Sequence, residues 1–320
     1  MNRQPWKCSL GWGLSVCAAL VLSGAAGAEY ASDFEGLDAS PAGTLLTGQD
    51  AYYLPPDTDS VDWYAYTYDG NVLQIVDNPC GGAQFVGGTG PGDGTFYARA
   101  QRDSEWGGGV WMVTYDVTGQ YLGAPPSADN IGSFSAQPFP GSASYIQLLN
   151  WTDPDTAEEW NARYIPYDAG GTQFAPPYAS AGPEWEGLPI NHWYRIRTWI
   201  DFDLNRITQV SLTDLATGET FTAQPDGWYL EGGEAGGFPT PTGFRFFAGS
   251  GTVEGNSAVF DNIIIAPPCP GDLDGDGTVN TADLLSLLAS WGTPCGDVDG
   301  NGDTNTADLL DLLANWGDCP

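Results

Sequence analysis

The sequence predicts a mainly β protein, a two-sheet sandwich followed by a small α-helical module. Three observations support this expectation. Residues 29–266 carry short runs of alternating apolar and polar residues, separated by Gly- and Pro-rich turns. Residues 267–320 contain one acidic loop pattern twice, 25 positions apart, and each copy leads into a helix-like repeat of leucines. Residues 1–28 fit neither part and have the character of a leader.

Residues 1–28 are expected to be a secretory signal. Arg3 and Lys7 form a basic start, an apolar run extends from about residue 14 to 22, and Ala26-Gly27-Ala28 fits a small-residue cleavage site. The apolar run is shorter than the ~20 residues that cross a bilayer. We therefore expect no membrane span and a secreted protein, either free outside the cell or attached to its surface.

The charge is strongly negative, with 9 basic against 41 acidic residues and a net charge of −32. Removing the leader removes two of the basic residues, which leaves seven arginines against the same 41 acids. A surface of this sign repels phosphate backbones and anionic lipids. Nucleic acid and anionic membranes are excluded as partners.

Strands are expected along the whole body. In the run YRIRTWIDF (194–202), alternation places Arg195 and Arg197 on one face and Ile196 and Ile200 on the other. Turn residues then lead into a partner strand. The other runs that read as strands are 110–116, 207–212, 243–247 and 257–265. Antiparallel runs with this spacing favour a jelly-roll-like sandwich.

The two acidic loops read DLDGDGTVNTAD (272–283) and DVDGNGDTNTAD (297–308). Calcium takes six to eight oxygen ligands, and a twelve-residue loop supplies them from positions 1, 3, 5, 7, 9 and 12, with glycine at position 6. Both copies satisfy this pattern, with Asp in place of the common Glu at position 12. We expect two Ca²⁺ ions. The predicted ligands are Asp272, Asp274, Asp276, Thr278, Asn280 and Asp283 in the first loop, and Asp297, Asp299, Asn301, Asp303, Asn305 and Asp308 in the second.

The helices after the loops are expected to pack together through one apolar stripe each. The i, i+3, i+4, i+7 spacing of apolar residues indicates such a stripe. Its predicted members are Leu284, Leu287, Leu288 and Trp291, and then Leu309, Leu312, Leu313 and Trp316.

Paired loop-helix units with Asp at position 12 and no entering helix resemble the type I dockerin domain over residues 269–320. This resemblance implies an EF-hand-like module that attaches a secreted protein, often a polysaccharide-degrading enzyme, to a cohesin-like or cell-surface partner. The family's recognition positions, 10 and 11 of each loop, correspond to Thr281-Ala282 and Thr306-Ala307.

Three fragments of the body, DFEG, NHWYRIRTWIDFDLNRI and AVFDNIII, are similar in pattern and order to the concanavalin A-like lectin/glucanase fold. The resemblance implies that the first and last strands are neighbours, which would bring Phe34 close to Phe260. It implies carbohydrate as the ligand class, because many members of that fold bind or process polysaccharides.

Four cysteines remain after removal of the leader, and they allow three connectivities. A pseudo-twofold pair of loop-helix units places the entry of the first loop beside the exit of the second helix. This arrangement favours a Cys269–Cys319 disulfide, with Cys80 and Cys295 either paired or free.

Catalytic motifs are weak in the body. The Glu-x-Asp-x-x-Glu strand of laminarinase-type glucanases is absent, and His192 is the only histidine, expected to be structural. Paired acids occur at Glu184/Glu186, Asp201/Asp203 and Asp153/Asp155 and are expected to be solvated. We expect most tryptophans to fill the core, with Trp106, Trp151, Trp160 and Trp185 as the best candidates for exposure on a sugar-binding surface.

The expected function is extracellular polysaccharide binding or processing, with the tail providing attachment. The alternatives are a glycoside hydrolase or lyase with an unfamiliar acid pair, and a non-catalytic surface or adhesion protein.

Overall fold

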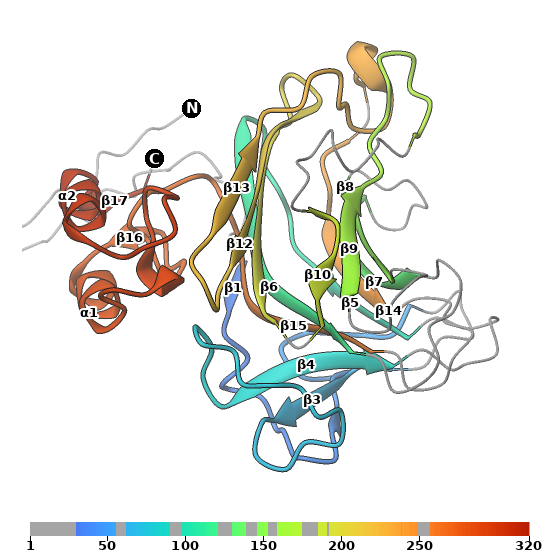
Figure 1. Cartoon of the computed structure of the whole chain (residues 1–320). Helices are drawn as coiled ribbons and strands as arrows, with labels where there is room; N and C mark the ends of the chain where they lie inside the picture. Colours follow the sequence, from blue (N-terminus) through green and yellow to red (C-terminus); the bar gives the residue numbers. More distant parts are fainter. Residues whose placement is uncertain are drawn as a thin grey trace, which may run out of the picture.

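The computed structural model describes residues 30–55, 62–89, 98–120, 130–138, 146–152, 159–174, 185–190, 192–237, 239–248 and 257–319. The expected leader, the acids Asp153, Asp155 and Glu184, and the side chain of Trp151 lie outside this part of the chain. Within it, two antiparallel sheets face each other and a small helical tail lies beside one of them (Figure 1). The predicted mainly β sandwich is confirmed.

The larger sheet carries the tail on its outer face. Its central strands pair antiparallel over long registers, as in Asp201↔Val110 and Tyr194↔Val117 of β11 and β6. In spatial order its described strands are β13 (Thr220–Ala223), β12 (Arg206–Asp214), β11 (Tyr194–Asp201), β6 (Val110–Gln120), β15 (Ser257–Ala266), β4 (Gln84–Thr89), β3 (Tyr64–Thr67) and β2 (Thr44–Leu45), and β1 (Tyr30–Ser32) also pairs with β15.

The smaller sheet packs against the inner face of the larger one. In spatial order its described strands are β10 (Leu188–Pro189), β9 (Glu159–Tyr164), β8 (Ile146–Thr152), β7 (Asn130–Gln137), β14 (Gly243–Ala248) and β5 (Arg99–Asp103). Aromatic rings join the two sheets: Tyr115 of β6 stacks on Phe134 of β7 with ring centroids 5.3 Å apart. The main core is therefore an apolar layer between the sheets, and a second buried cluster of the body includes Tyr66, Phe85 and Trp193.

The inward and outward faces of β11 are those that alternation predicts. Ile196 and Ile200 are buried in the core, and Thr198 hydrogen-bonds to Tyr164 across it, with the two hydroxyl oxygens 2.7 Å apart. Arg195 and Arg197 lie on the opposite face of the strand, toward the tail.

The first and last strands of the sandwich are neighbours. Tyr30 of β1 pairs with Ile265 of β15, and Ser32 pairs with Ile263. Phe34 follows β1 and is buried in the same core cluster as Phe260. The strand pairing expected from the lectin/glucanase resemblance is thus present.

The prediction of exposed tryptophans is wrong for three of the four side chains named. Trp106, Trp160 and Trp185 are all buried in the sandwich core. Trp160 lies on β9 and points inward in the alternating pattern of that strand, while Trp106 stacks on Trp111. Local Gly and Pro content marks the chain as loop-like, but it does not show that the loop folds back over the core.

The tail contains two helices of nine residues, α1 (Thr281–Ala289) and α2 (Thr306–Ala314). A two-stranded ribbon joins the first loop to the end of the tail, with β16 (Thr278–Val279) paired to β17 (Gly317–Asp318). Two short 3-10 turns complete the described elements, one in the body at Gly233–Ala235 and one between the loops of the tail at Pro294–Gly296.

The apolar stripe predicted for each tail helix is wrong in half of its members. Leu287 and Leu312 are fully buried between the helices, and Leu284 and Leu309 pack against them. By contrast Leu288, Trp291, Leu313 and Trp316 are each 47–48% exposed. One residue advances about 100° around a helix, so Leu288 points away from the narrow interface that Leu287 fills. Trp291 lies beyond the end of α1, where helical spacing no longer applies.

The tail packs directly on the outer face of the nine-stranded sheet. A disulfide joins Cys80 in the sandwich to Cys295 in the tail, across a sequence separation of 215. A Cβ on Gly275 would contact Ala31, and one on Gly302 would meet the Gly218 carbonyl, so both loops lie in close contact with the body. Among the helices that the structure describes, none is long and apolar enough to cross a membrane.

Candidate metal centre

The first loop is shaped by hydrogen bonds from its own backbone to its carboxylates. The Asp272 carboxylate accepts from Gly275 N at 2.9 Å and from Gly277 N at 3.1 Å. Gly277 has φ 83°, a backbone conformation that glycine adopts without steric cost. The sharp turn at position 6 therefore directs two amides, those of Gly275 and Gly277, toward the carboxylate in position 1.

The second loop repeats this geometry 25 residues later. The Asp297 carboxylate accepts from Gly300 N at 2.8 Å and from Gly302 N at 3.1 Å, and Gly302 has φ 92°. The backbone pairing beside each loop repeats as well. Val279 of the first loop pairs with Gly317, and Thr304 of the second loop accepts a hydrogen bond from Gly292 N. The two units are structural repeats.

Each position-12 aspartate caps its helix and closes its loop. Asp283 accepts from Leu273 N at 2.7 Å and, through its other oxygen, from Asn280 N at 2.8 Å. Asn280 is the N-cap of α1 and accepts from Ala282 N, which completes a capping box. Asp308 and Asn305 form the same box at α2. In both units the position-12 aspartate therefore joins the start of the loop to the start of the helix.

Carboxylates converge in both loops. In the first loop, oxygens of Asp272, Asp274 and Asp276 lie within 4.8 Å of one another, and in the second loop the same holds for Asp297, Asp299 and Asp308. All of these donors are oxygens, the ligand type that Ca²⁺ prefers. Of the remaining predicted positions, Asn280 and Asn305 are N-caps, and Asp283 is the buried cap of α1. Thr278 and Asp303 follow the turn glycine, and Asn301 precedes it and accepts from Asp303 N.

The electrostatics of both loops favour a bound cation. Burial, with added repulsion from Asp283 and Asp274, raises the pKa of Asp272 to about 6. Burial and the neighbouring carboxylates also raise the pKa of Asp274, and burial raises that of Asp297. Crowded, partly desolvated carboxylates are stabilised by a positive ion among them. The donor chemistry of both loops therefore fits Ca²⁺.

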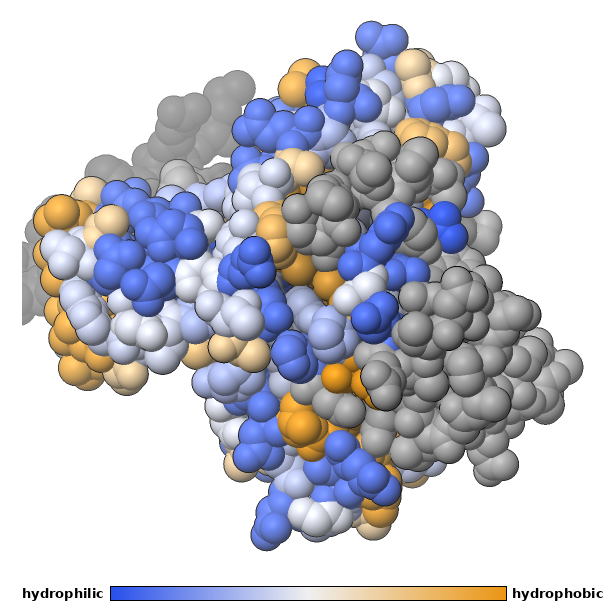
Figure 2. Space-filling model, viewed as in Figure 1, coloured by the Kyte–Doolittle hydropathy of each residue, from blue (hydrophilic) through white to orange (hydrophobic). Residues whose placement is uncertain are grey.

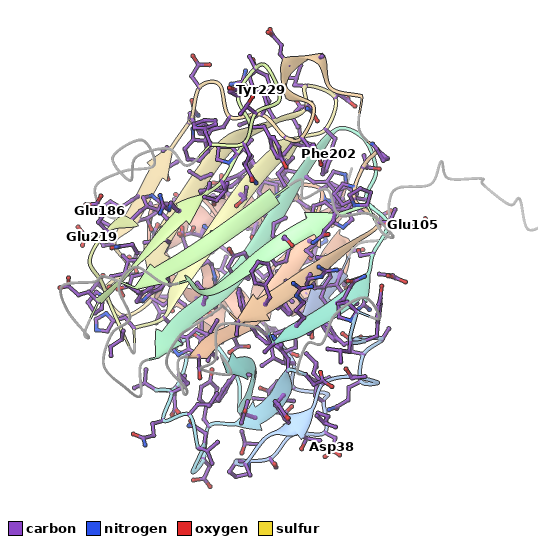
Figure 3. All side chains as sticks on the ribbon, turned by 90° about the vertical axis from the view of Figure 1, so that its right-hand side faces the viewer. Asp38, Glu105, Glu186, Phe202, Glu219 and Tyr229 are labelled. Carbon is purple, nitrogen blue, oxygen red and sulfur yellow. A yellow bond between two sulfur atoms is a disulfide. The ribbon has the colours of Figure 1, made fainter. Side chains whose placement is uncertain are left out.

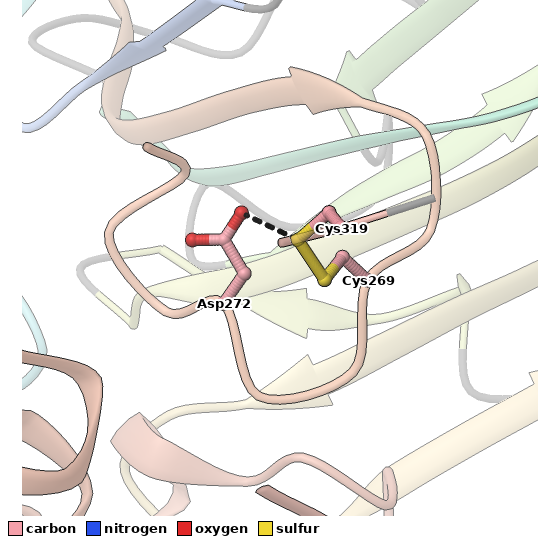
Figure 4. Close-up of side chains that lie close together, drawn as sticks. All are labelled: Cys269, Asp272 and Cys319. Atoms are coloured by element: carbon pink, nitrogen blue, oxygen red, sulfur yellow. Dashed lines mark hydrogen bonds between the residues drawn. A yellow bond between two sulfur atoms is a disulfide. The ribbon is translucent and has the colours of Figure 1, made fainter. Parts of the chain in front are cut away.

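A third cluster does not form a metal site. Cys269, Asp272 and Cys319 lie together, with Asp272 Oδ2 3.6 Å from Cys319 Sγ (Figure 4). Cys269 and Cys319 are bonded to each other, so neither sulfur is a thiolate ligand and Cys319 carries no proton to donate. This disulfide joins the entry of the first loop to the end of the tail, which is the pairing that the sequence favours.

Two arginines of β11 reach the second loop unit, which the sequence reasoning did not anticipate. Arg197 Nη2 donates to the Asp297 carbonyl at 2.9 Å, and Nη1 lies 3.7 Å from Asp297 Oδ2. Arg195 donates to the carbonyl of Cys295 at 3.2 Å and forms a two-pronged ion pair with buried Asp116. The alternation of β11 already placed both guanidinium groups on one face, and that face is the one the tail covers.

The other residues singled out in the sequence lie outside the carboxylate clusters. The recognition positions Thr281, Ala282, Thr306 and Ala307 are exposed at the helix starts. His192 lies 3.4 Å from Asp214, while Asp201 and Asp203 accept backbone hydrogen bonds in turns, from Leu204 N and Gly109 N.

The outer face of the six-stranded sheet, the face turned to the viewer in Figure 3, carries a row of hydrogen-bonded polar side chains. Arg245 of β14 is paired in register with Gln101 of β5 and Ser135 of β7. Its guanidinium donates to Gln101 Oε1 at 2.6 Å, and Gln101 donates to the Tyr53 hydroxyl at 2.6 Å. Arg99 lies in the next outward position of β5. Gln101 and Ser135 are buried, whereas Arg245 and Arg99 are half-buried and present guanidinium groups on this face.

Comparisons with known proteins give only remote structural likenesses. No family model matches the chain, and no curated protein matches it. Similar solved structures include an alginate lyase from Pseudomonas aeruginosa (11% identity, TM-score 0.36, covering 57% of this chain and 82% of that one). They also include a cellulose-induced protein (15%, 0.40, 74% and 97%) and a metal-free lectin from Griffonia simplicifolia (12%, 0.33, 53% and 80%). Likenesses this remote say nothing about the chemistry of this chain.

Proposed function

We propose that this chain is a secreted polysaccharide-binding protein, attached to a partner or a cell surface through a calcium-dependent, dockerin-like tail. The observation that carries the proposal is the repeated loop, in which carboxylates converge around the same backbone turn twice. Two Ca²⁺ ions would be held by the twelve predicted ligands. Two disulfides are typical of a protein in an extracellular or otherwise oxidising compartment.

The attachment surface is the exposed side of the two tail helices. Thr281, Leu285 and Leu288 occupy positions i, i+4 and i+7 of α1 and are all exposed. Thr306, Leu310 and Leu313 repeat this arrangement on α2. Figure 2 shows apolar residues along the edge of the tail that faces away from the sandwich. Paired apolar faces beside the recognition positions support docking to a cohesin-like or cell-surface protein.

The polysaccharide surface centres on Arg245, on the outer face of the six-stranded sheet. Arg245 is half-buried, and the buried Gln101 of the adjacent strand accepts from its guanidinium at 2.6 Å and fixes its position. A guanidinium held in this way matches the hydroxyls and carboxylates of sugars.

A calcium titration of the full secreted chain by isothermal calorimetry tests the metal proposal. We expect two bound ions, together with a calcium-induced gain in helical circular dichroism and thermal stability. Asp272→Ala combined with Asp297→Ala should abolish both effects, whereas Asp311→Ala, an exposed α2 residue outside the loops, should preserve them. If a calcium chelator changes neither the thermal stability nor the helical circular dichroism, the proposal is contradicted.

A panel of neutral and acidic polysaccharides, assayed by affinity electrophoresis, tests the sandwich. Retardation that Arg245→Ala weakens, with unchanged thermal stability, would support the polar row as the binding surface. The same incubations should be assayed for reducing ends and unsaturated products, since product formation would establish an enzyme in place of a binding protein.

A further inference from the structure

A positively charged side chain of the sandwich, Arg197, contacts the second loop. Arg197 contacts Asp297, the first ligand of that loop, through both its carbonyl and its carboxylate. The side chains are 13% and 1% exposed, respectively. Because the pair is shielded from water, the guanidinium acts strongly on the carboxylate that an incoming ion must use. It also opposes the rise in the pKa of Asp297 that burial causes.

The first loop has a different neighbour. The Asp272 carboxylate accepts from the amides of Gly275 and Gly277 and lies 3.6 Å from the sulfur of Cys319. Its loop packs on Ala31 and Ile264, which are apolar. Among the described ion pairs, none involves a ligand of the first loop.

The loops also differ in which ligand positions carry carboxylates. Position 5 is Asp276 in the first loop and Asn301 in the second, while position 7, which is Asp303 in the second loop, supplies only its backbone carbonyl. The first loop therefore has four ligand carboxylates, at positions 1, 3, 5 and 12, whereas the second has three plus the facing guanidinium. The ligand charge count is one of the variables that tune calcium affinity in such loops.

We infer that Arg197 makes the second loop a weaker calcium site under the control of the sandwich, so that the first loop fills first. This rests on the calcium binding proposed above. An ion in the second loop must compete with the guanidinium for Asp297. Cys295, two residues before Asp297, is bonded to Cys80, so the loop cannot move away from β11 to escape this competition.

Calcium titrations of the full chain and of variants test the inference. In the wild type we expect two affinities that differ by about tenfold or more, since each factor of ten corresponds to ~1.4 kcal/mol. Asp297→Ala should keep the tight site and Asp272→Ala the weak one. Arg197→Gln should tighten the weak site about tenfold and leave the other unchanged. Arg197→Lys retains the charge and should retain the weak affinity.

The control is Arg102→Gln, which removes an equal charge from the ion pair with Asp50, away from the loops. It should change neither affinity. Asn301→Asp provides a second route if Arg197→Gln does not fold, and it should tighten the weak site with Arg197 in place. If the two sites have equal calcium affinities and Arg197→Gln changes neither, this inference is wrong, while the proposed calcium binding stands. No binding at either loop would overturn the proposed function and this inference together.

Discussion

Cys80 and Cys295 are bonded to each other, although one belongs to the sandwich and the other to the tail. Beside this bond, Arg195 donates to the carbonyl of Cys295 and Asn262 donates to the carbonyl of Cys80. A module that follows a sandwich in sequence need not touch it. Here the covalent link and the flanking hydrogen bonds fix the tail to the outer face of the sheet.

Replacing both cysteines of this bond should lower the stability of the whole chain. Cys80→Ser with Cys295→Ser removes a constraint on a very long loop of the unfolded chain, and a loss of about 2–5 kcal/mol in the free energy of unfolding is expected. Urea denaturation followed by both tryptophan fluorescence and helical dichroism measures it. Separation of the two transitions in the variant would show that the disulfide couples tail and sandwich, whereas an unchanged midpoint would contradict the prediction.

A close approach of two glycines provides a second contact between tail and body. Gly302 lies in the second loop and Gly218 in the turn between β12 and β13, and a Cβ on either would clash with the backbone of the other. Gly300, two residues earlier, has a similar backbone conformation, φ 80° against 92°, but open space around it.

Gly302→Ala should therefore destabilise the packing of the tail on the sandwich more than Gly300→Ala does. Both substitutions strain a positive φ, at a cost of about 1 kcal/mol, but only the first adds overpacking of about 1–3 kcal/mol. Thermal unfolding of the two variants under identical conditions measures the difference. Equal melting temperatures would show that the loop does not pack on the β12–β13 turn.

Much of the sandwich could be predicted from local sequence. Alternation along YRIRTWIDF gives both the strand and its two faces, because a sheet that is half buried imposes a period of two. Strand partners are not encoded locally: β6 lies between β11 and β15, which are distant in sequence. The burial of Trp160 and Trp185 likewise depends on segments that fold over the core.

The loops could be predicted in detail because their chemistry is local. Twelve consecutive residues supply the carboxylates, the turn glycine and the N-cap, and the structure repeats them faithfully. Arg197 was missed as a neighbour of Asp297 because 100 residues separate them. The only available signals were two arginines on one strand face and a cysteine without an assigned partner.

The corrected packing of α1 predicts opposite outcomes for adjacent leucines. Leu287 is fully buried between the helices, and Leu288 is 48% exposed. Leu287→Ala should cost about 2–5 kcal/mol through lost burial and a cavity. Leu288→Ala should change stability by about 0.5 kcal/mol or less. Thermal melts monitored at the helical dichroism band compare them, and equal losses would restore the predicted four-residue stripe.

A buried carboxyl lies under the disulfide that joins body and tail. Asp261 of β15 is paired in register with Asp116 of β6, which in turn is paired with Arg195 of β11. Asn78 and Tyr68 both donate to Asp261 Oδ2 at 3.1 Å. Burial, with added repulsion from Asp116, raises the pKa of Asp261 well above its usual range, and the hydrogen bonds oppose the shift only in part.

This carboxyl should make the protein less stable as pH rises. The unfolded chain releases the proton near pH ~3.9, whereas the folded chain keeps it to higher pH. The contribution of Asp261 is therefore complete below pH ~3.9 and is lost as pH rises through its folded-state pKa, at up to ~1.4 kcal/mol per pH unit. Asp261→Asn has a similar shape and no proton to lose, and the Tyr68 hydroxyl can accept from the new amide. Its stability relative to the wild type should increase from pH 4 toward pH 7 in urea denaturation. A difference that does not change with pH would mean that Asp261 is ionised in the folded protein, balanced by Arg195.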